Sequence, residues 1–134
     1  MPVYIDQMGR KVELSSTPKR IISLVPSQTE LLFDLELNEE IIGITKFCIH
    51  PSESVKQKLK IGGTKALNIK LITKLKPDLI IGNKEENEKG QVEELMQNFP
   101  VWMSDIADLA GAIDMIRKAG ELVDKTIEAE KLIR

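Results

Sequence analysis

The densest group of side chains that could do chemistry lies at residues 83–87, Asn-Lys-Glu-Glu-Asn, one glycine after the apolar run Leu-Ile-Ile at 79–81. An ammonium group, two carboxylates and two amides can bind a polar or charged ligand. Two interpretations of this segment stay open. Either Lys84 and Glu86 contact a ligand, or Asn87 begins the next helix as its N-cap, with Glu85 and Glu86 placed favourably near the positive end of the helix dipole.

The types and spacing of the nucleophilic and metal-binding residues do not indicate catalysis. Cys48 and His50 are the only cysteine and the only histidine, and they lie two residues apart. A zinc site needs about four ligands, and a Cys-His pair must face each other to act as nucleophile and base. We therefore expect no metal site, no cofactor, no catalytic residue and no enzyme.

A glycine loop supplies a further candidate. Residues 62–65, Gly-Gly-Thr-Lys, can point backbone N–H groups at an anion, but they lack the spacing of a nucleotide-binding P-loop. An ordinary turn explains them equally well. The alternative class of function is a small α/β enzyme for a phosphorylated or nucleotide substrate, which would use Lys65, Lys84 and Glu86.

The elements that position these residues alternate along the chain. Apolar runs at 21–25, 41–44, 78–81 and 101–103 predict strands, and helices are expected from 26, at 68–75, at 88–98 and from 108, with another helical segment from about 124. Ser27 with Glu30 forms a possible capping box, Asn68 and Asp108 are possible N-caps, and Gly120 marks a possible bend. Alternating segments at 3–6 and 11–14 predict a small N-terminal β-hairpin. The fold class is α/β, a mostly parallel sheet flanked by helices.

Parallel strands with right-handed crossovers end at the same edge of the sheet. Polar segments at 26–27, 45–51, 62–65, 83–87 and 104–105 should meet there, where open α/β sheets bind ligands. Trp102 is expected in the core. The predicted ligand-binding residues are Pro26, Ser27, Phe47, Thr64, Lys65, Asn83, Lys84 and Glu86.

Composition limits the class of partner. The chain has 134 residues, 30% of them charged, and a net charge of −2. It fits one domain or part of one. A nucleic-acid binder usually has a basic face, so no nucleic-acid partner is expected. Residues 1–10 contain no apolar signal-peptide region, and a single cysteine leaves the redox compartment open.

Three motifs resemble a known family in their order along the chain. They are Arg-Ile-Ile-Ser-Leu-Val-Pro-Ser-Gln-Thr-Glu-Leu-Leu at 20–32, Ile-Gly-Ile-Thr at 42–45, and Leu-Ile-Thr-Lys-Leu-Lys-Pro-Asp-Leu-Ile-Ile at 71–81. The set is similar to the N-terminal lobe of class III substrate-binding proteins of ABC transporters. That family binds cobalamin, ferric siderophores and haem between two lobes joined by a long helix, with metal-ion receptors as more distant relatives.

The resemblance implies a single lobe of a two-lobed binding protein. Residues 1–19 would be an N-terminal hairpin and linker, 20–123 the lobe, and 124–134 the start of the helix between lobes. The expected partners are a cobalamin-like, haem or ferric-chelate ligand, an ABC permease, and either a missing C-terminal lobe or a second copy of the chain. The resemblance implies a periplasmic or extracytoplasmic location, and the absence of a signal peptide in this chain leaves a cytoplasmic one open. Phe47 is the only aromatic residue in the expected loops, which favours a ligand smaller or more anionic than a corrin ring stacked on several aromatics.

Overall fold

A computed structural model describes residues 3–134; Met1 and Pro2, which belong to the predicted segment 1–19, lie outside the described residues. A parallel five-stranded sheet forms the centre, in the order β5-β4-β3-β8-β9. Its strands are β3 (Ile21–Ser23), β4 (Ile41–Ile44), β5 (Leu59–Lys60), β8 (Leu79–Asn83) and β9 (Val101–Ser104). The parallel α/β fold predicted from the alternating pattern is confirmed.

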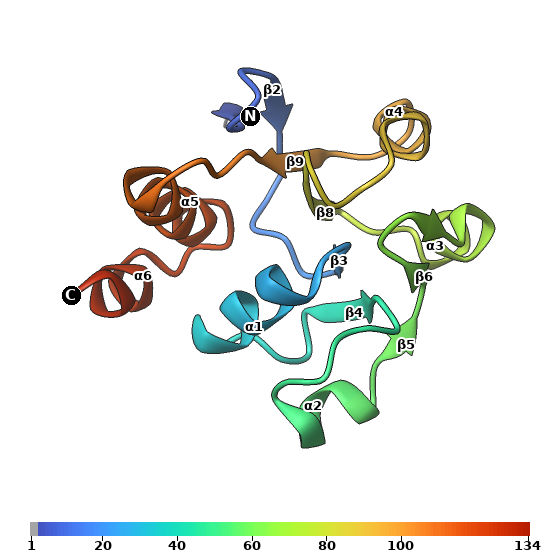
Figure 1. The fold of residues 1–134 in the computed structure, drawn as a ribbon, viewed down its shortest axis with the longest axis horizontal. Coiled ribbons are helices and arrows are strands. Elements are labelled where there is room, and N and C mark those ends of the chain that lie inside the picture. Colours follow the sequence, from blue (N-terminus) through green and yellow to red (C-terminus); the bar gives the residue numbers. More distant parts are fainter. Residues whose placement is uncertain (1–2) are drawn as a thin grey trace.

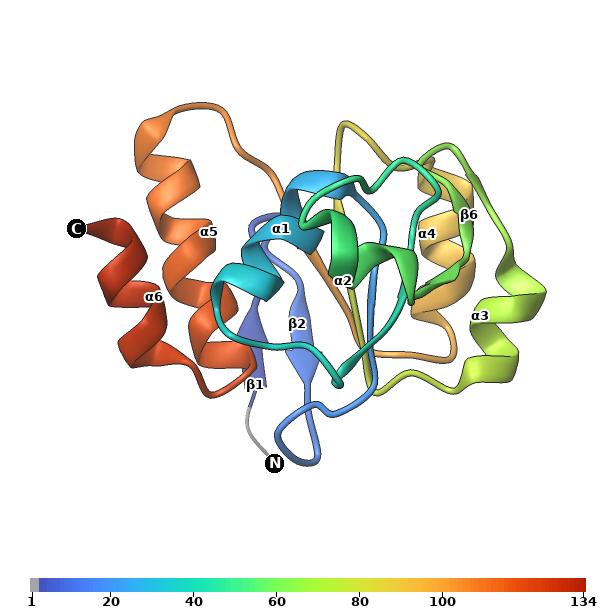
Figure 2. The same cartoon turned by 90° about the horizontal axis from the view of Figure 1, so that it is seen from below.

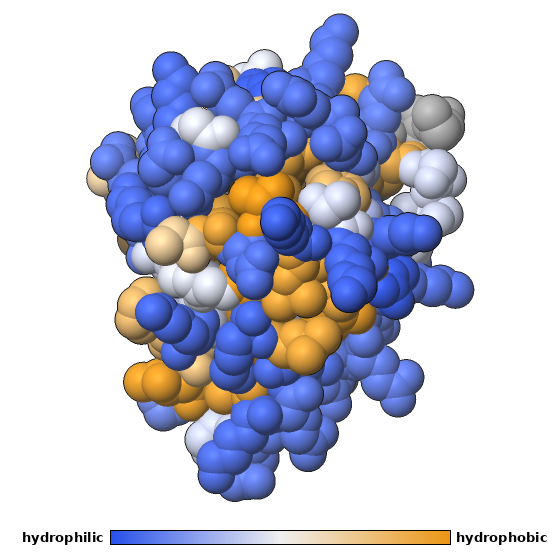
Figure 3. Space-filling model, turned by 90° about the vertical axis from the view of Figure 1, so that its right-hand side faces the viewer, coloured by the Kyte–Doolittle hydropathy of each residue, from blue (hydrophilic) through white to orange (hydrophobic). Residues whose placement is uncertain are grey.

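Helices cover both faces of this sheet (Figure 1). They are α1 (Pro26–Asp34), α2 (Ser52–Lys56), α3 (Ile69–Leu75), α4 (Lys89–Met96), α5 (Leu109–Leu122) and α6 (Thr126–Ile133). Successive residues of a strand point to opposite faces, so Ile21 packs in the cluster with α1 and α5, while Ile22 packs in the cluster with α3 and α4. Trp102 is fully buried, as predicted. On the side that carries α3 and α4, hydrophilic side chains surround a narrow apolar strip (Figure 3).

The predicted N-terminal hairpin is present beside strand β9. Strands β1 (Val3–Ile5) and β2 (Lys11–Glu13) pair antiparallel. The turn between them hydrogen-bonds to β9: Gln7 N donates to Met103 O at 3.0 Å, and Met103 N donates to Asp6 Oδ2 at 3.2 Å. At the end of β9, Asp105 N donates to Gln7 Oε1 at 2.9 Å. The hairpin therefore covers part of the outer edge of the sheet.

The segment between α2 and α3 differs from the prediction. Residues 62–65 were expected to form a loop, but β6 (Gly62–Gly63) and β7 (Ala66–Leu67) form a second small antiparallel hairpin, with Thr64 and Lys65 at its turn. Gly62 has φ +107, and a Cβ there would lie 2.4 Å from Ala66 O, so this position requires glycine. Strand β5 was not predicted at all.

Two of the four predicted helix caps are confirmed. Asn68 accepts from Leu71 N at 3.1 Å at the start of α3, and Asp108 accepts from Gly111 N at 2.8 Å at the start of α5. The capping box of Ser27 and Glu30 is wrong. The N-cap of α1 is Val25, without a side-chain hydrogen bond. Pro26 takes the first helical position, which suits its fixed φ and its missing N–H, so Ser27 already lies inside the helix.

The predicted N-cap at Asn87 is also wrong. Helix α4 begins one residue later, and Glu88 is its N-cap, accepting from Gly90 N at 2.7 Å and Gln91 N at 3.0 Å. A carboxylate at this position satisfies two free N–H groups and carries the charge that the helix dipole favours. The side chain of Asn87 instead forms hydrogen bonds to backbone groups of other loops.

The last two helices lie side by side (Figure 2). Helix α5 continues without interruption through Gly120 and ends at Leu122, and Asp124, with φ 58, lies in the turn that leads to α6. Gly120 instead permits the close approach of α6, because a Cβ there would lie 2.5 Å from the Cβ of Ala129. The division into 1–19, 20–123 and 124–134 stays a prediction. None of the described helices is long and apolar enough to span a membrane.

Candidate functional site

The loops that follow the parallel strands meet at one end of the sheet. Figure 2 shows the loops leading to α4 and to α5 at the same end of the molecule. Hydrogen bonds join them: Asn87 Nδ2 donates to Leu24 O at 3.1 Å and to Thr64 O at 3.0 Å, and Lys46 N donates to Gly62 O at 2.9 Å. We call the surface formed by residues 26–27, 45–51, 62–65, 83–87 and 104–109 the loop edge. The predicted convergence of polar segments is therefore observed.

A buried network of hydrogen bonds between α1, β8 and β9 supports the loop edge. Gln28 Nε2, on the first turn of α1, donates to Gly82 O at 2.8 Å and to Ser104 Oγ at 2.7 Å. Asn83 Nδ2 donates to the same Ser104 Oγ at 2.9 Å. Gln28 and Ser104 are buried. These hydrogen bonds hold the ends of β8 and β9 against α1.

The two asparagines of the segment 83–87 shape its backbone. Asn83 Oδ1 accepts from Glu85 N at 2.9 Å and Glu86 N at 3.1 Å, which closes a tight turn. Asn87 is buried, and its Oδ1 accepts from Asn83 N at 2.9 Å. Asn87 is therefore neither a helix cap nor an exposed ligand group. Both asparagines use their side chains to present Lys84, Glu85 and Glu86 to solvent.

The charged groups of the loop edge are accessible. Lys84 Nζ lies 3.7 Å from Asp105 Oδ2, and these side chains are 52% and 36% exposed. A pair this exposed contributes little to stability, so an anionic ligand can replace Asp105 at small cost. Glu86 is exposed. Lys65 differs, because its Nζ donates to Glu85 O at 2.7 Å and Asn87 O at 3.3 Å and so braces the loop.

Exposed apolar residues flank this charged centre. Phe47 and Ile49, after β4, are 55% and 65% exposed, and Ile106 and Leu109, after β9, are 42% and 75% exposed. Strands β4 and β9 lie on opposite sides of β3 and β8, so the apolar groups stand at two ends of the loop edge. Lys46 Nζ lies 5.3 Å from the Phe47 ring centroid, within cation–π range.

Three of these apolar residues, Ile49, Ile106 and Leu109, were missed from the sequence. For Ile49 and Ile106 the signal was an aliphatic side chain inside a mostly polar loop, whereas Leu109 is the first residue of α5. Of the predicted residues, Ser27 is exposed, while Pro26 and Thr64 are half-buried. All eight predicted residues lie at this edge, on loops, at the start of α1 or, for Asn83, at the end of β8. Their contact with a ligand stays a prediction.

Cys48 is buried beside two threonine hydroxyls. Its Sγ lies 3.2 Å from Thr29 Oγ1 and 3.3 Å from Thr45 Oγ1, and the residue is buried. Thr29 Oγ1 in turn donates to Ser23 Oγ at 2.8 Å. Within residues 3–134, no group of three or more His, Cys, Asp and Glu side chains is placed to hold a metal ion.

The fold is that of one lobe of a two-lobed solute-binding protein, a parallel sheet whose strand ends present an amphipathic surface. The sequence matches the family described as periplasmic binding protein over residues 21–134, and the chain belongs to this family. The resemblance found from the sequence motifs is thus confirmed.

Individual relatives agree with this assignment. The vitamin B12-binding protein of Vibrio vulnificus is 31% identical over 115 residues, which cover 84% of this chain and 42% of that protein. An uncharacterized ABC transporter substrate-binding lipoprotein of Bacillus subtilis, YvrC, is 36% identical over 83 residues, which cover 61% of this chain and 26% of that protein.

Solved structures show the same fold. SirA of Staphylococcus aureus, complexed with staphyloferrin B, superposes with a TM-score of 0.82 and 26% identity over 99% of this chain and 46% of that one. The molybdate-binding protein MolA of Haemophilus influenzae superposes with a TM-score of 0.88 at 15% identity, over 99% of this chain and 49% of that one, which shows the fold alone. The chain spans less than half the length of these relatives.

Proposed function

We propose that this chain is the N-terminal lobe of the substrate-binding component of an ABC uptake system for an iron-chelate or cobalamin-like ligand. The loop edge would form one wall of the ligand cleft. The observation that carries this proposal is the arrangement of exposed apolar groups around an exposed charged centre, held in place by the buried network of Gln28, Asn83 and Ser104.

The chemistry of the loop edge favours a ligand that combines apolar parts with anionic groups. Phe47 is the only aromatic residue it offers, whereas Lys46 and Lys84 supply exposed cations. Lysines suit the carboxylate groups of a ferric chelate, and one ring gives a corrin little stacking. SirA, a structural neighbour, was solved with staphyloferrin B, while a relative is named for vitamin B12. We therefore place a ferric chelate first, ahead of cobalamin and haem.

The same proposal extends to a complete two-lobed protein. A second lobe would supply the opposite wall, residues 124–134 would begin the connecting helix, and an ABC permease would receive the ligand. The relatives include periplasmic and lipoprotein substrate-binding proteins, which supports an extracytoplasmic location. The family consists of binding proteins, and we propose that the chain binds its ligand without chemical conversion.

Amide chemical shifts of the isotopically labelled chain test this proposal. We would titrate gallium-loaded staphyloferrin B, a diamagnetic substitute for the ferric chelate, and cyanocobalamin in parallel. The expected result is a saturable shift of amides at the loop edge, around Phe47, Lys84 and Ile106, with weak affinity because one wall of the cleft is absent. Phe47→Ala should weaken the response, and Lys74→Gln, on the exposed side of α3, should not.

Two outcomes would overturn the proposal. Shifts confined to another surface would move the site away from the loop edge. Turnover of a phosphorylated or nucleotide substrate that requires Lys84 and Glu86 would favour the enzyme alternative.

A further inference from the structure

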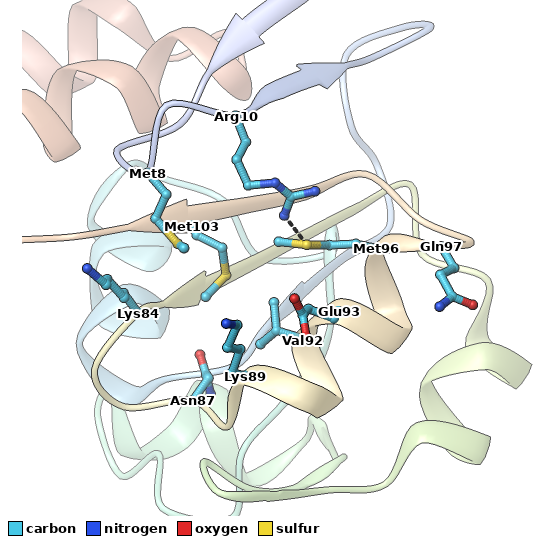
Figure 4. A pocket seen from close by; sticks show the side chains of 10 residues that line it. All are labelled: Met8, Arg10, Lys84, Asn87, Lys89, Val92, Glu93, Met96, Gln97 and Met103. Atoms are coloured by element: carbon cyan, nitrogen blue, oxygen red, sulfur yellow. Dashed lines mark hydrogen bonds between the residues drawn. The ribbon is translucent and has the colours of Figure 1, made fainter.

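A pocket of about 670 Å³ lies beside the loop edge, between the turn of the N-terminal hairpin, strand β9 and helix α4 (Figure 4). Its volume falls in the range of small-molecule sites, roughly 300–1,000 Å³. It shares only Lys84 and Asn87 with the loop edge. The elements that form it come from distant parts of the sequence, and no sequence motif indicated it.

The pocket has apolar walls made largely of methionine. Met8 comes from the hairpin turn, Met96 from α4 and Met103 from β9, and all three side chains reach into the same space (Figure 4). Met103 and Val92 are 2% and 4% exposed and form its base, while Met8 is 42% exposed at the mouth. Methionine is unbranched and flexible, so such walls adapt to apolar groups of different shapes.

The rim of the pocket is positively charged. Arg10, Lys84 and Lys89 line it against a single carboxylate, Glu93. Among the described residues, neither Arg10 nor Lys89 forms a salt bridge. The guanidinium of Arg10 instead contacts the Met96 sulfur, which is a weak acceptor. Its donors are therefore available to an anion, and a guanidinium binds a planar carboxylate in a two-pronged geometry.

We propose that this pocket binds a small amphipathic anion, an organic carboxylate or sulfonate with an apolar body. The apolar body lies against Met8, Met96 and Met103, and the anionic group meets Arg10 and Lys89. Three thioethers would also suit a soft metal ion, but the adjacent positive charges oppose a metal cation. This site borders the proposed ligand cleft, but its anion would meet Arg10 and Lys89, which lie outside the loop edge, so its failure would leave the cleft proposal intact.

The dye 8-anilinonaphthalene-1-sulfonate is a suitable probe, because it joins an aromatic body to a sulfonate. We expect a saturable rise in dye fluorescence with one site per folded chain. Arg10→Gln combined with Lys89→Gln should weaken binding at least about fivefold, since it removes both unpaired cations. Decanoate should displace the dye, whereas decanol, which lacks the charge, should displace it poorly.

Two control variants distinguish binding in this pocket from binding elsewhere on the protein surface. Lys70→Gln combined with Lys74→Gln removes the same charge from α3, where both lysines are exposed, and should leave dye affinity unchanged. Phe47→Ala alters the loop edge and should also leave it unchanged. The proposal fails if dye binding does not saturate, if the α3 control weakens binding as much as the pocket variant, or if Phe47→Ala abolishes binding. Circular dichroism confirms that each variant is folded.

Discussion

The side-chain amide of Asn87 donates to the carbonyl oxygen of Leu24 at 3.1 Å and so ties the loop before α4 to the loop before α1. The same nitrogen donates to Thr64 O at 3.0 Å, and the amide oxygen accepts from Asn83 N at 2.9 Å. One buried side chain thus joins three loops of the proposed cleft wall. The order of the loop edge depends on it.

Asn87→Ala should therefore destabilise the protein. It leaves the carbonyl of Leu24 and the amide of Asn83 without partners, and each buried unpaired group costs about 1–3 kcal/mol. We expect the free energy of unfolding in urea to fall by about 2–4 kcal/mol. Asn98→Ala is the matched control, because Asn98 is exposed, and it should change stability by less than about 0.5 kcal/mol. Equal effects of the two substitutions would contradict this role of Asn87.

The two glycines of α5 should respond in opposite directions to alanine. At Gly120 the new Cβ meets Ala129 Cβ at 2.5 Å and Lys125 O at 3.0 Å, so α6 must move, at a cost of about 1–3 kcal/mol. At Gly111 the nearest atom is the end of the Asp108 side chain at 3.3 Å, so the helix propensity of alanine, worth up to about 1 kcal/mol, should dominate. Thermal unfolding of both variants tests this, and a stabilised Gly120→Ala would show that the helices do not pack as described.

Asp114 should make the free energy of unfolding depend on pH. Burial raises its pKa, but hydrogen bonds from Gln7 and Lys118 and the charge of Lys118 outweigh this and hold the pKa below its ordinary value. The folded state then binds the proton less readily than the unfolded state. The stabilisation is present above the unfolded pKa and is lost as pH falls through the lower folded pKa. The effect is small, since the side chain is 44% exposed.

Urea unfolding at about pH 5.5 and about pH 3, on either side of the ordinary aspartate pKa, measures this dependence. Asp114→Asn should lose less stability between these two conditions than the unsubstituted protein. Asp34→Asn is the control, because Asp34 is exposed. An unchanged acid dependence in Asp114→Asn would contradict the assignment.

Cys48 should be protected from thiol reagents in the folded protein. Its side chain is buried, 5% exposed, and its sulfur contacts the hydroxyls of Thr29 and Thr45. Reaction with an aromatic disulfide reagent should be at least about 100-fold slower than in urea, because it requires local opening. Rapid modification without denaturant would show that the loop after β4 is open to solvent.

The sheet could be predicted from the sequence because its strands are buried on both faces and so appear as continuous apolar runs. The convergence of the loops then follows from parallel pairing. Strand β5 and the β6–β7 hairpin could not be predicted, since two-residue strands carry no periodic pattern. The cap at Ser27 was wrong because α1 begins at Pro26, two residues earlier than the capping-box pattern implies.

The site was only partly predictable for a different reason. Phe47 was found because an aromatic residue in a polar loop is conspicuous, but Ile106 and Leu109 are aliphatic residues whose exposure depends on the packed structure. Likewise, the partners of Asn87 lie on loops as far away as Leu24, so no local pattern shows that its amide is buried. Long-range contacts decide what single residues in loops do.

The hairpin turn beside β9 also affects how copies of this chain meet. The backbone N–H of Gln7 donates to the carbonyl oxygen of Met103, and the N–H of Met103 donates to the carboxylate of Asp6. These backbone groups of Met103 therefore cannot pair with a strand from another molecule. Exposed sheet edges are templates for intermolecular strand addition and amyloid growth. At the opposite border, β5 is only two residues long and gives an incoming strand little to pair with. Both borders of the sheet are thus protected against aggregation.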